Sequence, residues 1–270
     1  MVARPQLTRT ERVTTTTTDF ARELMRLSDS AESHNWLVYG DSNAGKTVFA
    51  SSVPGKALWL AGEPGFKSAV RRGAKGYVRS VTDASMAWAA VEWLQAKNHA
   101  EQLDWLIVDG ATTMQDKVRA NYCAEAFDRD NTKRAHRNLP DRPDYFNTQN
   151  WVKAWVGALI DLPVNLLITA HAYRTDHTEN GELLVFPGFQ GKVTEIANAV
   201  SGLMDVTAYY VNKTFTNRRG VKKNVRRMYF ESPDSDEIRY IVGDKSGRLP
   251  AHLDFPTVPE LLEIMETKDA

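Results

Sequence analysis

Short apolar runs and longer amphipathic segments alternate along most of the chain. The apolar runs predict buried strands, and the segments with helical spacing between them predict helices. A strand, a helix and a second strand within roughly thirty residues are typical of a parallel sheet. The expected strands are 36–39, 56–61, 77–81, 103–109, 164–170, 204–211 and 237–242, and the expected helices are 47–53, 83–94, 114–127, 151–162, 192–200 and 257–266. The sequence therefore predicts an α/β fold, with a mostly parallel central sheet flanked by helices.

Four regions fall outside this alternation. Residues 1–18 are polar and a short helical pattern follows them, so we expect 1–32 to form a flexible arm with a short helix. The polar stretches 128–150 and 172–190 lack periodicity and are predicted to be long mobile loops. Residues 213–230 are typical of an antiparallel hairpin, and 251–270 of a tail with a short helix. The core domain is therefore predicted to span 33–250.

The first apolar run leads directly into a phosphate-binding motif. Its eight residues fit the pattern G-x-x-x-x-G-K-[ST] at every defined position. Such a loop wraps a polyphosphate with backbone N–H groups and opens a helix toward the anion. Lys46 is expected to reach the β- and γ-phosphates, and the Thr47 hydroxyl to bind Mg²⁺. The alternative is a chance match on a turn. The motif consists of Gly40, Asp41, Ser42, Asn43, Ala44, Gly45, Lys46 and Thr47.

Three polar residues follow other predicted strands. Asp109 ends the run 103–109 and can hold Mg²⁺ through its water ligands. Glu63 follows the run 56–61, where a carboxylate can orient and deprotonate water. His171 directly follows the run 164–170 and can hydrogen-bond the γ-phosphate, and Thr169 is a weaker candidate for that contact. The alternative for each residue is an ordinary position in a turn at the end of a strand.

This order of motifs resembles the RecA/KaiC-type ATPase core. More narrowly, the chain resembles the phage-encoded single-domain RecA-like proteins that partner single-strand DNA-binding proteins in recombination. The resemblance covers about 33–250 and implies an oligomeric, Mg²⁺-dependent ATPase in which Glu63 activates water and His171 senses the γ-phosphate. It also implies that 128–150 and 172–190 face DNA. The first of these stretches is longer than a minimal RecA core needs, and a recognisable DNA-binding accessory domain is missing.

The predicted hairpin carries the densest group of cations in the chain. Seven lysines and arginines lie within 213–227, with Phe215, Tyr229 and Phe230 beside them. Such a group can follow a phosphate backbone and offer aromatic faces to bases. A solvated hairpin edge is the alternative, because charges also protect edge strands from aggregation. The residues that we expect to bind single-stranded DNA are Arg218, Arg219, Lys222 and Lys223.

A second basic pair lies in the turn 244–248. RecA-like ATPases hydrolyse ATP between subunits, where cations of a neighbour reach the γ-phosphate. The resemblance therefore implies that Lys245 and Arg248 complete the catalytic site of a neighbouring subunit. An ordinary turn in which both cations are solvated is an equally good reading of the same residues.

The composition limits the kinds of binding site and the cellular compartment that we expect. Lysine and arginine total 34, as do aspartate and glutamate, so the net charge is zero and any nucleic-acid site must be a local patch. Cys123 is the only cysteine, which excludes an internal disulfide and any cysteine-cluster metal site. The N-terminus lacks an apolar leader, and charges interrupt the apolar stretch 151–170. We therefore expect a cytoplasmic protein without a membrane span.

Together with the motifs, the resemblance implies a phage ATPase that uses ATP and Mg²⁺, binds single-stranded DNA as an oligomer and promotes annealing or recombination. One alternative is a P-loop phosphotransferase that acts on a small molecule and uses 128–150 as a lid. The other is a nucleotide-gated scaffold that does not hydrolyse its nucleotide, in which Glu63 is only a turn residue.

Overall fold

The structure is a computed structural model, and it describes residues 33–96, 99–176, 178, 181–191, 194–216 and 222–267. These residues belong to one compact unit that begins at Ser33. The predicted arm 1–32 and the tip of the predicted hairpin, 217–221, lie outside the described residues.

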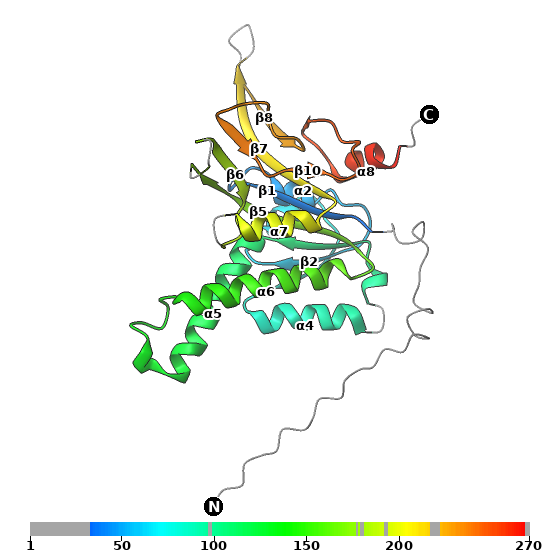
Figure 1. The fold of residues 1–270 in the computed structure, drawn as a ribbon. Helices are drawn as coiled ribbons and strands as arrows, with labels where there is room; N and C mark the ends of the chain where they lie inside the picture. Colours follow the sequence, from blue (N-terminus) through cyan, green and yellow to red (C-terminus); the bar gives the residue numbers. More distant parts are fainter. Residues whose placement is uncertain are drawn as a thin grey trace, which may run out of the picture. The chain divides into compact units, whose positions relative to one another are not determined.

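A central sheet forms the frame of this unit (Figure 1). Six neighbouring strands run parallel, in the order β3, β2, β4, β5, β1 and β7. Beyond β7, the strand β8 pairs antiparallel with β7, and β11 pairs antiparallel with β8. The predicted α/β fold with a mostly parallel sheet and a C-terminal antiparallel hairpin is thus confirmed. In sheet order the strands are β3 (Gly76–Ser80), β2 (Ala57–Ala61), β4 (Trp105–Asp109), β5 (Asn165–Thr175), β1 (Asn35–Gly40), β7 (Val206–Thr216), β8 (Lys222–Tyr229) and β11 (His252–Asp254).

Both faces of the central part of the sheet are covered, which explains why β1, β2 and β4 are buried along their whole length. On β1, Leu37 and Tyr39 belong to one buried cluster and Trp36 and Val38 to a second one. The first cluster contains residues of α4 to α7, and the second contains residues of α2 and α8, so these helices lie on opposite faces (Figure 1). The helices are α2 (Lys46–Ala50), α3 (Phe66–Val70), α4 (Ala84–Gln95), α5 (Ala111–Arg129), α6 (Arg142–Ile160), α7 (Glu195–Leu203) and α8 (Val258–Glu266).

The parallel register brings the predicted site residues to one edge. Gly40, at the end of β1, lies opposite His171 on β5. Asp109 ends β4 and lies opposite Ala61, the last residue of β2. Carboxyl ends of parallel strands with loops around them are where such sheets bind ligands. The carboxyl ends of the parallel strands therefore bring together the P-loop, Glu63, Asp109 and His171.

The stretch 128–150 differs from the predicted loop, because α5 continues to Arg129 and α6 begins at Arg142. Asp141 and Asp144 form a capping box at the start of α6, and Pro143 occupies its first turn. Asp144 is buried and accepts two hydrogen bonds from Arg134, at 2.6 and 2.9 Å. Only the part between the two helices is irregular, apart from a 3₁₀ turn at Asn131–Lys133.

The stretch 172–190 also contains regular structure. The strand β5 continues to Thr175, beyond the end of the predicted strand, and pairs antiparallel with β6 (Leu183–Pro187). A short strand, β9 (Ile238–Tyr240), extends this ribbon by pairing with β6. The antiparallel pairing cannot be seen in the sequence, because the residues of β6 do not alternate strictly between polar and apolar.

The C-terminal region matches its prediction in outline. The hairpin consists of β7 and β8, paired from Tyr209–Tyr229 to Thr216–Lys222. The tail contains α8 at 258–266, preceded by β11, which pairs with β8. No helix within the described residues is long and apolar enough to cross a membrane.

Candidate active site

The P-loop joins β1 to α2 and closes around the side chain of its own lysine. Gly45 has φ +112°, and Asn43 has φ +63°, so two of its residues adopt left-handed backbone angles. The Lys46 ammonium is buried and donates to the carbonyl oxygens of Gly40 and Asp41, both at 2.9 Å. Burial lowers the pKa of Lys46, although the nearby carboxylates of Glu63, Asp109 and Asp41 oppose this shift. A phosphate at this position would be a stronger acceptor for the ammonium than two carbonyls.

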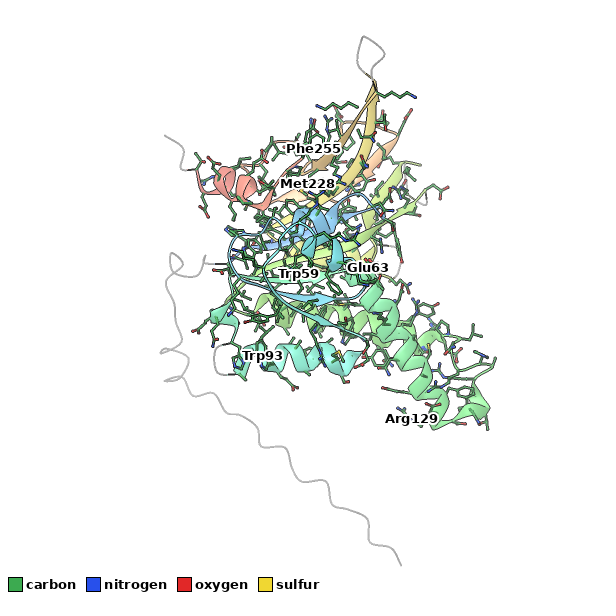
Figure 2. All side chains as sticks on the ribbon, turned by 180° about the vertical axis from the view of Figure 1, so that it is seen from behind. Trp59, Glu63, Trp93, Arg129, Met228 and Phe255 are labelled. Carbon is green, nitrogen blue, oxygen red and sulfur yellow. The ribbon has the colours of Figure 1, made fainter. Side chains whose placement is uncertain are left out.

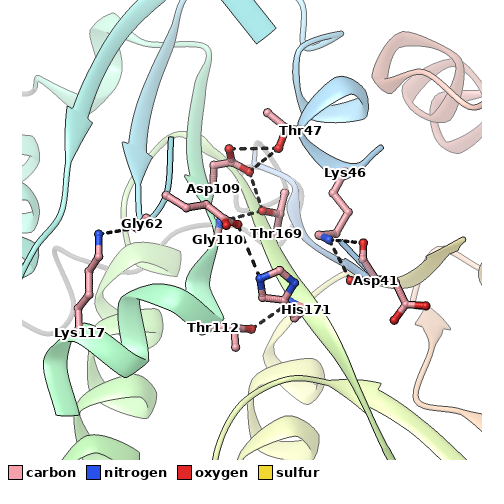
Figure 3. Close-up of polar contacts among 12 residues, drawn as sticks. Asp41, Lys46, Thr47, Gly62, Asp109, Gly110, Thr112, Lys117, Thr169 and His171 are labelled. Atoms are coloured by element: carbon pink, nitrogen blue, oxygen red, sulfur yellow. Dashed lines mark hydrogen bonds and ion pairs between the residues drawn. The ribbon is translucent and has the colours of Figure 1, made fainter. Parts of the chain in front are cut away.

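Asp109 lies beside the P-loop threonine, Thr47, and contacts it (Figure 3). The Thr47 hydroxyl is 3.0 Å from Asp109 Oδ1 and 3.2 Å from Oδ2. Thr169 donates its hydroxyl hydrogen to Oδ1 at 2.9 Å and accepts from the Gly110 N–H at 2.9 Å. Asp109 is 1% exposed, and burial raises the pKa of its carboxyl while the two threonine hydroxyls lower it. A second role for Thr169 thus emerges, because it fixes the carboxylate of Asp109.

The donor set fits a magnesium ion held together with phosphate oxygens. Thr47 and Asp109 supply oxygen ligands, which Mg²⁺ prefers. Gly65 leaves room beside them, since a Cβ there would lie 3.1 Å from Asp109 Oδ2 and 3.2 Å from Thr47 Oγ1. Among the described residues, no group of three His, Cys, Asp or Glu side chains could hold a metal alone. A metal bound at Thr47 and Asp109 would therefore need further ligands, which the phosphate oxygens of a nucleotide can supply.

Glu63 and His171 lie beside this pair. Glu63 Oε1 is 3.8 Å from His171 Nε2, and both side chains are partly exposed. The backbone N–H of His171 donates to the Thr112 hydroxyl at 3.0 Å, and Lys117 donates to the Gly62 carbonyl (Figure 3). The Glu63 side chain also passes over Gly110, where a Cβ would lie 2.9 Å from Oε1. Both residues thus lie at the carboxyl ends of the strands, where the sequence predicts them.

A salt bridge that the sequence does not predict holds the outer part of the P-loop. Arg174, on β5, donates to both carboxylate oxygens of Asp41, at 2.8 and 2.7 Å, and to Tyr209 at 3.3 Å. Hydrogen bonding to Arg174 lowers the pKa of Asp41. Arg174 lies in the predicted loop 172–190, so only the continuation of β5 beyond His171 brings it to the P-loop.

A cavity of about 560 Å³ adjoins the P-loop. Its lining includes Glu63 and His171, together with three cations that the sequence analysis does not assign to the nucleotide. Lys67 and Arg71 come from α3 and the residue after it, and Arg226 comes from β8. The Arg226 side chain approaches Gly45 so closely that a Cβ there would lie 3.1 Å from it. One cation of the predicted DNA cluster therefore belongs to the nucleotide cavity.

The other predicted basic residues lie elsewhere. Lys222 and Lys223 are exposed on β8, Arg227 pairs with Asp254 at 2.6 Å, and Arg218 and Arg219 lie outside the described residues. Lys245 donates to the Gly202 carbonyl at 3.0 Å and Arg248 to the Met265 carbonyl at 2.6 Å. Their turn follows β10 (Gly243–Asp244), which pairs with the amino end of β7, at the edge opposite the P-loop. Neither cation can reach the P-loop of its own subunit from there.

Asp109→Asn should stabilise the protein at neutral pH when Mg²⁺ and nucleotide are absent. The folded-state pKa of Asp109 is raised. Its favourable contribution to the free energy of unfolding is therefore complete below about pH 3.9 and is lost as pH rises through the folded-state pKa. The neutral amide avoids this loss. We expect a Tm a few degrees higher at pH 7, since 1 kcal/mol corresponds to about 2–4 °C in a protein of this size. The difference should shrink toward pH 4, and an equal difference at both pH values would contradict the assignment to the charge of Asp109.

One protein family matches most of the chain. The AAA domain family matches residues 33–236. One solved structure that matches is a KaiC-like protein from the hyperthermophilic archaeon Pyrococcus horikoshii OT3, with a TM-score of 0.39 and 9% sequence identity, over 73% of this chain and 78% of that chain. No curated protein matches the sequence.

Proposed function

The chain belongs to the AAA domain family of P-loop proteins, and from this premise we propose that it is an ATP- and Mg²⁺-dependent ATPase that acts on single-stranded DNA as an oligomer. The proposal includes a role in phage recombination or repair, through annealing or strand pairing, with a single-strand DNA-binding protein as a partner.

Hydrolysis is supported by the position of Glu63. This carboxylate is partly exposed in the same cavity as Lys46 and Thr47, so a water molecule beside a γ-phosphate can reach it. A general base needs this accessibility, whereas Asp109 is buried and suited to holding the metal. When bound, Mg²⁺ neutralises charge on the β- and γ-phosphates. Lys46 binds those phosphates, Glu63 accepts a proton from water, and His171 is placed to contact the γ-phosphate.

The two alternative functions find less support. A phosphotransferase would need a mobile, arginine-rich lid, but Arg142 begins a capped helix and Arg134 is engaged by Asp144. A scaffold that does not hydrolyse its nucleotide would not need a carboxylate directed at the cavity, as Glu63 is. An ATPase therefore explains more of the described site than either alternative.

The DNA part of the proposal rests on a groove between the two stretches that the resemblance implies for DNA. It has a volume of about 670 Å³ and is lined by the first turns of α6 and by β5 and β6. Phe146 is 63% exposed and Tyr145 is 40% exposed, and Arg142 lies beside them. Aromatic faces with a cation nearby are typical of sites that stack single-stranded bases. Lys222 and Lys223 offer a second, purely electrostatic surface.

These two surfaces predict different responses to salt. Lys222→Glu with Lys223→Glu should weaken binding of single-stranded DNA and lower the log–log salt slope by about 0.7 for each lost phosphate contact. Phe146→Ala should weaken binding by about 5- to 100-fold with little change in slope, because stacking releases no counterions. Fluorescence anisotropy across salt concentrations measures both effects. Lys75→Glu, an exposed cation next to β3, is the control. If neither variant differs from this control, DNA does not bind at these surfaces.

The overall proposal is tested by the ATPase rate with and without single-stranded DNA over a range of protein concentrations. We expect DNA to stimulate phosphate release, and the rate per subunit to rise with concentration as oligomers form. Transfer of phosphate to a small molecule instead of water would favour the phosphotransferase. Nucleotide binding without turnover under all conditions would favour the scaffold.

A further inference from the structure

A second hollow continues from the phosphate cavity along α2. It has a volume of about 360 Å³ and shares Val48 and Arg226 with the phosphate cavity. Its remaining walls come from the end of α2 and the following turn, from Arg72, from Tyr210 on β7, and from the loop between β11 and α8. The hollow therefore adjoins the phosphate cavity, next to the place where a ligand on the P-loop would hold its phosphates.

Phe255, in the wall of this hollow, has an unusual backbone conformation. This residue has φ +54°, a left-handed angle that is rare for bulky side chains, and Pro256 follows it, which restricts its backbone further. Its ring is nevertheless 49% exposed, so burial of the ring does not offset the strain. Figure 2 shows Phe255 near Met228 of β8 and far from Trp93 on α4. Strain of this kind tends to be retained where a side chain must contact a ligand.

The surrounding contacts hold this conformation. The Phe255 N–H donates to the Arg226 carbonyl at 2.6 Å. Before it, Asp254 accepts two hydrogen bonds from Arg227, at 2.6 and 3.0 Å. After it, the Val258 N–H donates to Ser52 Oγ at 2.8 Å, which ties the start of α8 to the turn after α2. The loop is thus fixed on both sides of Phe255, and the hollow exists before a ligand enters it.

The chemistry of the hollow suits an aromatic base. The Phe255 ring offers an apolar face, and Arg72 and Arg226 supply guanidinium groups that stack on aromatic rings. The Arg226 guanidinium makes no hydrogen bond or ion pair with any described residue, so it is free for a ligand. The described lining contains hydroxyls of Ser51, Ser52 and Thr257 but no carboxylate. Guanine would leave its N1–H and amino donors without an anionic acceptor here, whereas adenine has fewer donors to satisfy.

We propose that this hollow binds the base and ribose of the nucleotide, with Phe255 stacked on the adenine ring and Arg226 placed between the base and the phosphates. The assignment rests on the proposed function, because it requires a nucleotide on the P-loop. It also makes the two ends of the ligand separable: Lys46 holds the phosphates, and Phe255 holds the base.

Inorganic tripolyphosphate, which has no base, separates these two roles. Phe255→Gly removes the ring and keeps the left-handed backbone, which glycine adopts without strain. We expect its Kd for ATP to rise about 5- to 100-fold, as for the loss of one stacked base, and its Kd for tripolyphosphate to stay unchanged. Phe255→Trp should retain tight ATP binding. Calorimetry or competition binding with the full-length chain and Mg²⁺ measures all four values.

The controls distinguish this proposal from the proposed function. Tyr77→Ala removes an aromatic ring that is 61% exposed on β3 and should change neither affinity. Lys46→Ala should weaken both ligands. Equal weakening of both ligands in Phe255→Gly, or no weakening of either, would place the base elsewhere and leave the ATPase proposal intact. Tighter binding of GTP than of ATP by the parent would overturn the adenine assignment. Conversely, a parent that binds ATP through Phe255 but never hydrolyses it would retain the base site and refute the ATPase.

Discussion

Glu63→Gln is expected to bind ATP as the parent does but to hydrolyse it about 10²- to 10⁴-fold more slowly, the range typical for loss of a general base. Glutamine keeps the size of the side chain and can still orient water, but it cannot accept a proton. The P-loop contacts of Lys46 and the Thr47–Asp109 pair do not involve the Glu63 carboxylate, so affinity should be retained.

Single-turnover phosphate release and equilibrium ATP binding measure the two quantities separately. Glu101→Gln, an exposed carboxylate in the 3₁₀ turn Ala100–Gln102, is the matched control and should behave as the parent. A Glu63→Gln variant that hydrolyses ATP at the parental rate would show that Glu63 is a turn residue and that another group activates water. Loss of ATP binding would instead indicate that the substitution disturbs the turn around Gly62 and Gly65.

Arg248→Ala is expected to lose about 10³- to 10⁵-fold in ATPase rate while each subunit still binds ATP, if Arg248 completes the site of a neighbour. The turn of Arg248 lies at the sheet edge opposite its own P-loop, so a catalytic role requires a second subunit. Arg248 also donates to the Met265 carbonyl at 2.6 Å. To reach a phosphate of a neighbour, the Arg248 guanidinium would have to break this hydrogen bond or make both contacts at once. Lys245, in the same turn, should show a smaller effect in the same direction.

Mixing two inactive variants tests this arrangement directly. An Arg248→Ala subunit keeps an intact P-loop, whereas a Lys46→Ala subunit keeps an intact Arg248. A complete site forms where the P-loop of an Arg248→Ala subunit faces the Arg248 side chain of a Lys46→Ala subunit. Mixtures should therefore recover part of the parental ATPase rate. If confirmed mixed oligomers stay inactive at every ratio, Lys245 and Arg248 do not act between subunits and serve only their turn.

The sequence predicts which residues meet at the carboxyl ends of the parallel strands, because its signals for them are local. A glycine-rich octet, an apolar run that ends in Asp109 and a run that ends in His171 each lie within a few consecutive residues. The parallel register then brings them together without further information. By contrast, the start of α6 depends on Arg134 and Asp144, ten residues apart, and on a capping box of two aspartates rather than the usual Ser/Thr with Glu.

The hairpin shows a second limit of sequence patterns. Its cations resemble one cluster when they are counted along the chain, but alternation on β8 separates them. Arg226 lies on the same face as Met228, which packs in the core beneath α2, and so reaches the P-loop. Arg227 points to the other face and pairs with Asp254. Which face is which depends on the pairing of β8 with β7, and residue counting cannot supply that register.

The central place of β1 in the sheet also has a consequence for how the chain acquires its structure. Although β1 is the first described strand, its neighbours are β5 and β7, with Trp36 opposite Leu167 on one side and Val206 on the other. A ribosome adds about 5–20 residues per second, so β1 waits roughly 10 to 30 s for β7 to be made. During that time its apolar residues lack their final partners, and chaperones have an opportunity to bind them. Pairings of such long sequence separation also make folding slow, so these apolar residues should stay accessible longer than in a chain whose sheet neighbours follow one another in sequence.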